Sequence, residues 1–483
     1  MSTDVTSDAH GESAPESSAT QLASDRMSRE AVTVIVTLLV ATFVVILNET
    51  IMNVALQRLM TDLSVDAPTV QWLSTGFMLT MAVVIPTTGF ILQRLTTRAS
   101  FLLATGLFSG GTLLAALAPG FGVLLLARIV QAGGTAIMLP LLMTTILTLV
   151  PLSRRGAVMG NVTIAISVAP ALGPTVSGII LDHFSWRFMF IFVLPVALLA
   201  MGIGARFLTN VGERGNVKLD FLSVVLTVPA FGGLVYGLSQ IGGHSGATAV
   251  PIAALAVGVL CMVAFVFRQL KLQKSDAPLL DLRAFNFRMF TVSVLLMVVA
   301  MMALFGAVIL LPLYLQNVLR LQPMETGLAL LPGGLAMGLL GPVVGRLFDK
   351  IGPLPLTVTG SVLLVLTLWQ FSMLNAASPL WWVVVLYAVL SLGLALLFTP
   401  AFTTGLNPLP PHLYSHGSAI MSTLQQVAGA AGTALLVSIF AVVAAASGFV
   451  AGMQAAFLTA TFIAVVAVVL STMMRKTEGA PGH

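Results

Sequence analysis

Long apolar runs separated by short polar links fill the chain from residue 31 to residue 473. A helix that crosses a bilayer needs about 20 mostly apolar residues. The links between the runs carry Pro, Gly or charge, as turns between antiparallel helices do. We therefore predict an all-α integral membrane protein with fourteen transmembrane helices, centred on 32–56, 70–92, 100–118, 122–148, 157–181, 187–207, 220–240, 248–268, 289–316, 326–346, 355–374, 380–400, 418–441 and 452–473.

The two ends of the chain depart from this pattern. Residues 1–30 hold Ser, Thr, Ala and six acidic residues, with almost no large apolar side chains, which predicts a disordered cytoplasmic tail. No apolar run precedes residue 31, so we expect no secretory signal peptide, and we expect the first helix to direct membrane insertion. Residues 475–483 are polar and predict a second, short cytoplasmic tail.

The Lys and Arg residues indicate the orientation, because cytoplasmic links of membrane proteins are enriched in them. With both termini in the cytoplasm, 18 of the 22 Lys and Arg residues fall on the inner side. Only Arg58, Arg187 and Arg320 fall outside, while Arg128 lies within the fourth helix. The asymmetry predicts a multi-pass protein of the plasma (inner) membrane. Binding to nucleic acid is not expected, because no basic stripe with interleaved aromatic residues occurs.

Composition narrows the class of protein further. Charged residues make up 8% of the chain, against about 25% in soluble domains, and the mean hydropathy is +1.03. The single cysteine, Cys261, offers no disulfide framework, and His412 and His416 lack the acidic neighbours of a metal site. No GxxxxGK[ST] loop and no catalytic grouping is visible. These features favour a secondary carrier without cofactor or metal over an ATP-driven pump or an enzyme.

The chain also repeats internally. The stretch GFILQRLTTR (89–98) follows the second helix, and GRLFDKIGPL (345–354) follows the tenth. Duplicated six-helix halves are typical of transporters. We therefore predict two six-helix bundles, at 31–207 and 284–474, with two additional helices and a cytoplasmic linker inserted at 208–283.

Two charges lie within the apolar runs. Glu49 of the first helix and Arg128 of the fourth both fall roughly 8 Å to the outer side of the midplane, at about 1.5 Å per residue. Asn53 and Gln131 each lie one turn from one of these charges. A static ion pair that fixes packing is one interpretation. Because intramembrane ionisable groups are by default functional, we favour a proton-coupling site at Glu49 and Arg128.

Glycines and aromatic residues supply the remaining candidates. Gly173, Pro174 and Gly178 in the fifth helix combine a bend with room for a close neighbour. They predict a hinge or sliding seam, although simple packing explains most such glycines. The repeated cytoplasmic stretches are either gates or merely solvated turns that follow the distribution of positive charge. The candidates are Gly89, Arg94 and Arg98 in the first half, and Gly345, Asp349 and Gly352 in the second.

These motifs, in this order, resemble the fourteen-helix drug:proton antiporter branch of the major facilitator superfamily. LNETIMNVAL (47–56), GFILQRLTTR (89–98), LLLARIVQAGGTA (124–136), ALGPTVSG (171–178) and WRFMFIFVLP (186–195) resemble its motifs. Within the branch, the chain is most similar to lincomycin-resistance-type exporters. The usual first-helix acid falls on Asn48, one residue before Glu49. The first cytoplasmic stretch has Gln93 and Thr96 where the family has an acid and a glycine, and Val193 replaces a usual Asn.

The resemblance implies a proton-coupled multidrug efflux antiporter that exports amphipathic drugs, including cations, by alternating access, and that works as a monomer. The substrate-binding candidates are Asn48, Glu49, Asn53, Gln131, Trp72, Phe77, Phe305 and Tyr314. Two other functions stay open: a dedicated exporter of an endogenous lipid, antibiotic or metabolite, and a membrane sensor or assembly factor with a carrier-like fold.

Overall fold

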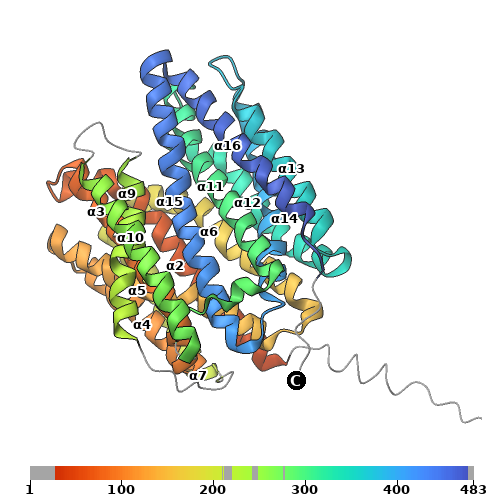
Figure 1. The fold of residues 1–483 in the computed structure, drawn as a ribbon. Coiled ribbons are helices and arrows are strands. Elements are labelled where there is room, and N and C mark those ends of the chain that lie inside the picture. The colour runs from red at the N-terminus through yellow and green to blue at the C-terminus, as the bar shows by residue number, and fades with distance from the viewer. Residues whose placement is uncertain (1–27, 209, 211–219, 242–248, 276–277, 477–483) are drawn as a thin grey trace, which may run out of the picture.

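The computed structural model describes residues 28–208, 210, 220–241, 249–275 and 278–476, and in these residues helices are the dominant structure (Figure 1). Fourteen helical segments of the described chain are long and apolar enough to cross a membrane, as the sequence predicted. The predicted disordered tail at 1–30 lies almost entirely outside the described residues, as do parts of the predicted linker and of the C-terminal tail.

The first six helices form one bundle, in which α2 packs on α6, α4 on α5, and α7 on α4. Their bounds are α2 (Arg29–Asp62), α3 (Ala67–Arg94), α4 (Thr97–Ala116), α5 (Phe121–Leu149), α6 (Arg155–His183) and α7 (Arg187–Phe207). The last six helices form the second bundle, in which α13 packs on α14 and α16, and α11 on α15. Their bounds are α11 (Arg288–Asn317), α12 (Pro323–Ile351), α13 (Pro353–Phe371), α14 (Leu380–Leu406), α15 (Tyr414–Ser447) and α16 (Phe449–Thr472).

The seventh span is interrupted. It consists of α8 (Phe221–Thr227), a π-helical turn (Val228–Gly232) and α9 (Gly233–Ile241). Pro229 lies in the π-helical turn, which fits because proline has no N–H to donate and forces the local ladder to shift. The eighth span is α10 (Ala249–Leu272), which packs on α9. Figure 1 shows this inserted pair beside α3 and α15, so it borders both bundles.

Polar contacts fasten the inserted helices to the linker that follows them. Arg268 of α10 binds both carboxylate oxygens of Asp220, the residue that caps α8, at 2.6 Å each. The two hydrogen bonds from Arg268 lower the pKa of Asp220 to about 2. The fully buried Gln269 donates to Ser223 at 2.8 Å and accepts from the Leu279 amide at 2.9 Å. These contacts therefore connect α8, α10 and the linker at Leu279 into one unit.

Helix lengths differ from the prediction at several ends. The first helix continues to Asp62, so Arg58 lies within α2 and pairs with Asp62 at 3.3 Å rather than lying in a link. The thirteenth span, α15, is about ten residues longer than the predicted 418–441, since it begins at Tyr414, directly after a 3-10 turn, and continues to Ser447. The polar residues at these ends can extend the helices beyond the apolar stretch, which sets only the minimum length of a span.

The two bundles meet along α6 and α12, where glycines let the helix backbones touch. A Cβ atom added at Gly160 or at Gly341 would overlap the carbonyl oxygen of the other glycine, and Gly156 and Gly345 are related in the same way. A second contact joins α3 to α15. We call the end of the molecule where α2 begins and α16 ends, at Arg29 and Thr472, the termini face.

Several hydrogen bonds between N or O atoms of the described residues cross the bundle interface. All of them join residues that lie closer to the termini face than to the opposite end of the molecule. The pairs are Gln93–His412, Thr144–Ser418, Pro140–Ser418, Arg155–Asn407, Arg155–Tyr414, Gly156–Asp349, Ala157–Asp349 and Thr163–Thr399; Gln93 also contacts the His416 ring. The bundles are thus held together at that end.

Candidate functional site: a buried arginine and two gates

Arg128 lies inside the N-terminal bundle, with 1% of its surface exposed. Its Nη1 donates to Oδ1 of Asn48 on α2 at 3.2 Å and to Oε1 of Gln131, one turn further along α5, at 2.9 Å. Its Cζ lies 4.1 Å from the ring centroid of Phe77 on α3. Burying a cation is unfavourable unless polar partners replace its hydration. Two helices, α2 and α5, supply polar partners here, and α3 adds the ring of Phe77, although Nε has no partner among the described residues.

Gln131 extends this network to a fourth helix. Its Nε2 donates to Oγ1 of Thr112 on α4 at 2.7 Å. The two helices approach closely at this point, since a Cβ atom added at Gly111 would lie 2.7 Å from the Gln131 backbone nitrogen. Asn48, Arg128, Gln131 and Thr112 therefore form one buried polar chain across α2, α5 and α4, which we call the Arg128 network.

Glu49 lies beside this network and not in it. Its side chain is half-buried, and it takes part in none of the ion pairs that the structure describes. The charges of Glu49 and Arg128 are nevertheless close enough to attract each other. One residue along a helix turns the side chain by about 100°. Asn48 thus occupies the position of contact, and Glu49 points to a different side of α2. The Asn53 side chain lies outside the described part of the chain.

The turn of α2 that carries Glu49 packs against α6. A Cβ atom added at Gly173 would overlap the side chain of Thr50, and the Thr50 hydroxyl is 3.4 Å from the Ala169 carbonyl oxygen. Gly173 is therefore needed for this helix contact. Gly178 differs from the expectation of a close neighbour, because nothing lies within 4 Å of an added Cβ. The ring of Pro174 lies outside the described side chains.

Asp349 of α12 caps the start of α6 in the other bundle. Its two carboxylate oxygens accept hydrogen bonds from the Gly156 and Ala157 amides, at 2.9 Å each. The first amides of a helix lack partners inside the helix and carry partial positive charge, so a carboxylate is favourable there. This contact lies near the termini face at a position that the sequence predicts as a gate, and we call it the Asp349 gate.

The equivalent contact in the first repeat is made without a charge. Gln93 of α3 donates to the His412 carbonyl oxygen at 3.0 Å and lies 2.8 Å from Nε2 of the buried His416. A Cβ atom at Gly89 would lie 2.8 Å from Nδ1 of His416. Gly89 and Gln93 therefore fit against the start of α15, as Gly345 and Asp349 fit against the start of α6. We call this contact the Gln93 gate.

The structure also explains why one repeat has Thr96 and the other Gly352. Gly352 ends α12 with φ = +79°, a conformation that favours glycine. Thr96 has φ = −67° and caps α4, its hydroxyl accepting from the Ala99 amide at 3.2 Å. Arg94 and Arg98 are exposed, and Arg94 lies over the ring of Phe90.

The remaining aromatic candidates are spread through the molecule. Trp72 is 42% exposed and stacks on Tyr236 of α9. Phe305 contacts Gly429 within the second bundle. Tyr314 is buried and donates to the Asn375 carbonyl oxygen at 2.8 Å. None of these three contacts reaches Arg128, whereas Phe77 alone among the four aromatics lies against the Arg128 guanidinium.

The sequence analysis missed one buried cation. Arg155 was counted as a charge of a cytoplasmic link, yet it is 6% exposed. It donates to the carbonyl oxygens of Leu147 and Val150 and, across the bundle interface, to Oδ1 of Asn407 at 3.0 Å. A pair of adjacent arginines before a helix gives no signal that one of them turns inward.

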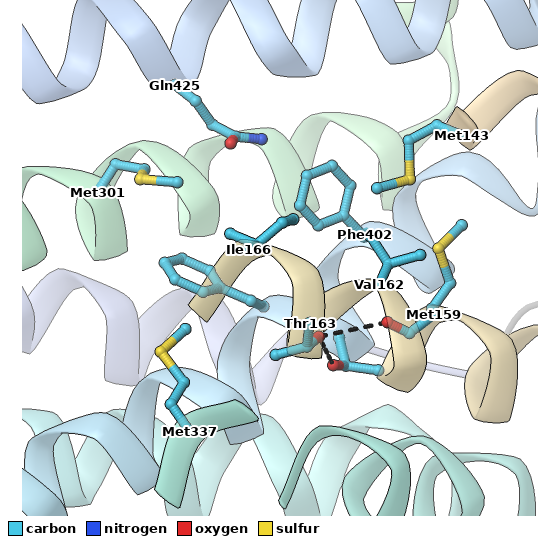
Figure 2. A pocket seen from close by; sticks show the side chains of 11 residues that line it. Met143, Met159, Val162, Thr163, Ile166, Met301, Met337, Phe402 and Gln425 are labelled. Atoms are coloured by element: carbon cyan, nitrogen blue, oxygen red, sulfur yellow. Dashed lines mark hydrogen bonds between the residues drawn. The ribbon is translucent and has the colours of Figure 1, made fainter. Parts of the chain in front are cut away.

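The sequence analysis also missed a pocket between the bundles. Methionines from both bundles and phenylalanines from the second line it, together with a pair of hydrogen-bonded threonines and one glutamine (Figure 2). The lining residues are Met143, Met159, Val162, Thr163, Ile166, Met301, Met337, Phe398, Thr399, Phe402 and Gln425. None of the predicted substrate-binding residues is among them.

Comparison with known proteins finds relatives that match nearly the whole length of the chain. The sequence of lincomycin resistance protein LmrB of Bacillus subtilis (strain 168) is 40% identical over 462 residues, which cover 92% of this chain and 96% of that protein. The MFS-type transporter YcnB of the same organism is 42% identical over 448 residues, 91% of this chain and 94% of that one. Multidrug resistance protein B homolog of Mycobacterium tuberculosis (strain H37Rv) is 30% identical over 391 residues, 80% of this chain and 72% of that one.

Solved structures share the fold. The human organic anion transporter MFSD10 superposes with a TM-score of 0.65 at 14% identity, covering 91% of this chain and 99% of that one. A double-tryptophan mutant of XylE superposes with a TM-score of 0.64 at 13% identity, covering 94% and 98%. The sequence model of the Major Facilitator Superfamily matches residues 38–433. With this match, the fourteen helices and the relatives at about 40% identity, the chain belongs to the Major Facilitator Superfamily and is a membrane transporter, not an enzyme.

Proposed function

We propose that the protein is a proton-coupled multidrug efflux antiporter of the plasma membrane, with both termini in the cytoplasm. The Arg128 network carries the proposal, because a cation buried in apolar surroundings next to a half-buried carboxylate is the arrangement that proton relays use. The relatives named for lincomycin and multidrug resistance support drugs as the substrates.

The bundle interface supports alternating access. The Asp349 gate and the Gln93 gate join opposite bundles near the termini face, each through the first residues of one helix. If that face is cytoplasmic, the state described is closed to the cytoplasm. Separating these contacts while the bundles rock along the glycine seam of α6 and α12 opens the route inward.

Glu49 is the proposed proton-linked group. When Glu49 is ionised, it attracts a cationic drug and offsets the charge of Arg128. A proton that enters from outside neutralises Glu49 and releases the drug. For an uncharged drug, a proton that moves inward down 100 mV supplies about 2.3 kcal/mol, which drives a modest drug gradient. Exchange of one proton for one monovalent cation moves no net charge, so there the pH difference supplies the driving force.

Transport by the purified protein tests this proposal. The protein is reconstituted in liposomes that contain a pH-sensitive dye at pH 6 in a bath at pH 7.5, and tetraphenylphosphonium or lincomycin is added. Exchange of lumenal protons for drug raises the lumenal pH faster than in protein-free liposomes. If no compound of a broad panel produces this change with folded protein, proton-coupled drug export is rejected.

A further inference from the structure

The pocket of Figure 2 has a composition suited to an uncharged molecule. In the state described it is nearly filled by side chains, with a free volume of about 20 Å³, so a substrate fits only after the bundles and the flexible methionines move apart. None of its lining residues carries a charge. Methionines Met143 and Met159 come from the first bundle, and Met301 and Met337 from the second. Methionine side chains are flexible and polarizable, so surfaces rich in them adapt to apolar bodies of different shapes.

Gln425 of α15 is the exception in this apolar lining. It is 8% exposed, and its Nε2 has no hydrogen-bond partner in the described part of the chain. Figure 2 shows the amide directed into the pocket, on the side opposite Thr163. A buried N–H without an acceptor is unfavourable, and such groups are rare in folded proteins.

The other polar groups of the pocket already have partners. The hydroxyl groups of Thr163 and Thr399 lie 2.8 Å apart and satisfy each other across the bundle interface. The next residue along the helix, Gln426, contacts the sulfur of Met81 at 3.8 Å and is not part of the lining. The Gln425 amide is therefore the one donor of the described lining that is directed into the pocket without a partner.

The pocket is also separate from the charged group at Glu49. None of the members of the Arg128 network lines it, and Glu49 does not line it either. The transporter thus offers a charged environment on α2 and α5, and an uncharged one with a single amide donor between the bundles.

We propose, given the transport function above, that this pocket binds the apolar body of uncharged substrates and that Gln425 selects those with a hydrogen-bond acceptor. The substrate class is a neutral lipophilic molecule with a carbonyl or similar oxygen. Its oxygen accepts the hydrogen bond that Nε2 otherwise lacks, and the methionines adjust to the remainder of the molecule.

Equilibrium binding to the purified full-length protein tests the selection. The probes are Nile red, which is neutral and has a carbonyl acceptor, diphenylhexatriene, which is neutral without one, and tetraphenylphosphonium, a cation without one. Gln425→Leu removes the donor and keeps the apolar volume. The affinity for Nile red should fall about 3- to 10-fold, the range of one neutral hydrogen bond. The affinities for the other two probes should change less than about 2-fold.

Two controls separate this role from a structural one. Gln426→Leu, on the neighbouring residue, should leave Nile red binding unchanged. The melting temperature of ligand-free Gln425→Leu should equal or exceed that of the wild type, because the substitution removes an unpartnered buried donor. Gln425→Met is the second variant if Gln425→Leu folds poorly.

The outcomes distinguish this proposal from the transport function. Unchanged Nile red affinity in both Gln425 variants, or an equal loss for all three probes, overturns the role of Gln425. Wild-type exchange of protons for tetraphenylphosphonium can persist in either case, so the antiporter proposal then stands. If the wild type shows no such exchange, the antiporter proposal is rejected. The binding measurements alone then decide the role of Gln425.

Discussion

Arg128 donates its hydrogen bond on α2 to Asn48, at 3.2 Å, while the carboxylate of the next residue lies outside the ion pairs that the structure describes. The fixed partner of the buried cation is thus a neutral amide. This leaves the Glu49 carboxylate available to exchange a proton or meet a cation without first breaking an ion pair.

Glu49→Gln should remove the pH dependence of cation binding. In the wild type, tetraphenylphosphonium should bind more tightly as the pH rises from 6 to 8 and should release protons, because it competes with the proton on Glu49. Titration calorimetry in two buffers of different ionisation heat measures both effects. Glu30→Gln, at the exposed start of α2, is the matched control.

Normal coupling in Glu49→Gln would assign the proton to another carboxylate, with Asp349 and Glu325 as the alternatives. The structure already engages both groups in helix capping. Glu325 accepts from the Gln322 amide at 2.8 Å, and Asp349 accepts from the start of α6.

Gly173→Leu should abolish export and lower the melting temperature, because its side chain would displace Thr50 and separate α2 from α6. Overpacking of this kind costs about 1–3 kcal/mol. Gly178→Leu is the control, since its side chain meets open space in this conformation. Export assays and thermal melts measure both variants. A Gly173→Leu protein with normal export would show that this contact is not needed for transport.

Asp349→Asn should open the Asp349 gate more often. The variant loses the attraction between a carboxylate and the start of α6, about 0.3–2 kcal/mol, so the open population should rise about 2- to 30-fold. The open population is measured by the rate at which N-ethylmaleimide modifies a cysteine at Thr399, in a Cys261→Ser background. Lys350→Gln, at an exposed neighbour, should leave the rate unchanged, and an unchanged rate in Asp349→Asn would contradict the gate.

Asp220→Asn should lower the melting temperature in a way that depends on pH. Hydrogen bonds from Arg268 lower the pKa of Asp220 to about 2, so the ionised group stabilises the folded state at and above the ordinary pKa of Asp, near 3.9. That contribution is lost as the pH falls towards 2. The difference between variant and wild type should be full at pH 7 and shrink below about pH 4. Asp62→Asn breaks a more exposed ion pair and should have a smaller effect; equal effects would contradict the assignment.

Cysteine labelling tests the orientation. In a Cys261→Ser background, a cysteine at the exposed Ala376 should react with an impermeant maleimide from outside intact cells. A cysteine at the exposed Ser275, on the side of the termini face, should react only after the membrane is opened. The reverse pattern would invert the proposed topology.

The sequence by itself determined the number and the approximate position of the helices, because the hydrocarbon thickness of a bilayer demands long apolar runs regardless of how they pack. It also singled out Arg128 and Asp349 as candidates, because isolated charges and repeated motifs stand out against an apolar background. The sequence could not predict which residues of different helices pair. Only the packing decided that Asn48 and not Glu49 contacts Arg128, since that depends on how α2 is rotated about its axis.

The tertiary structure likewise decided which similar residues differ in role. Gly173 touches Thr50 while Gly178 faces open space, and Arg155 turns inward although Arg154 beside it is exposed. The donor of Gln425 stands out only once six helices from two bundles surround it. Apolarity along one chain fixes what enters the membrane, whereas contacts between distant segments fix which polar groups find partners and which stay available to a substrate.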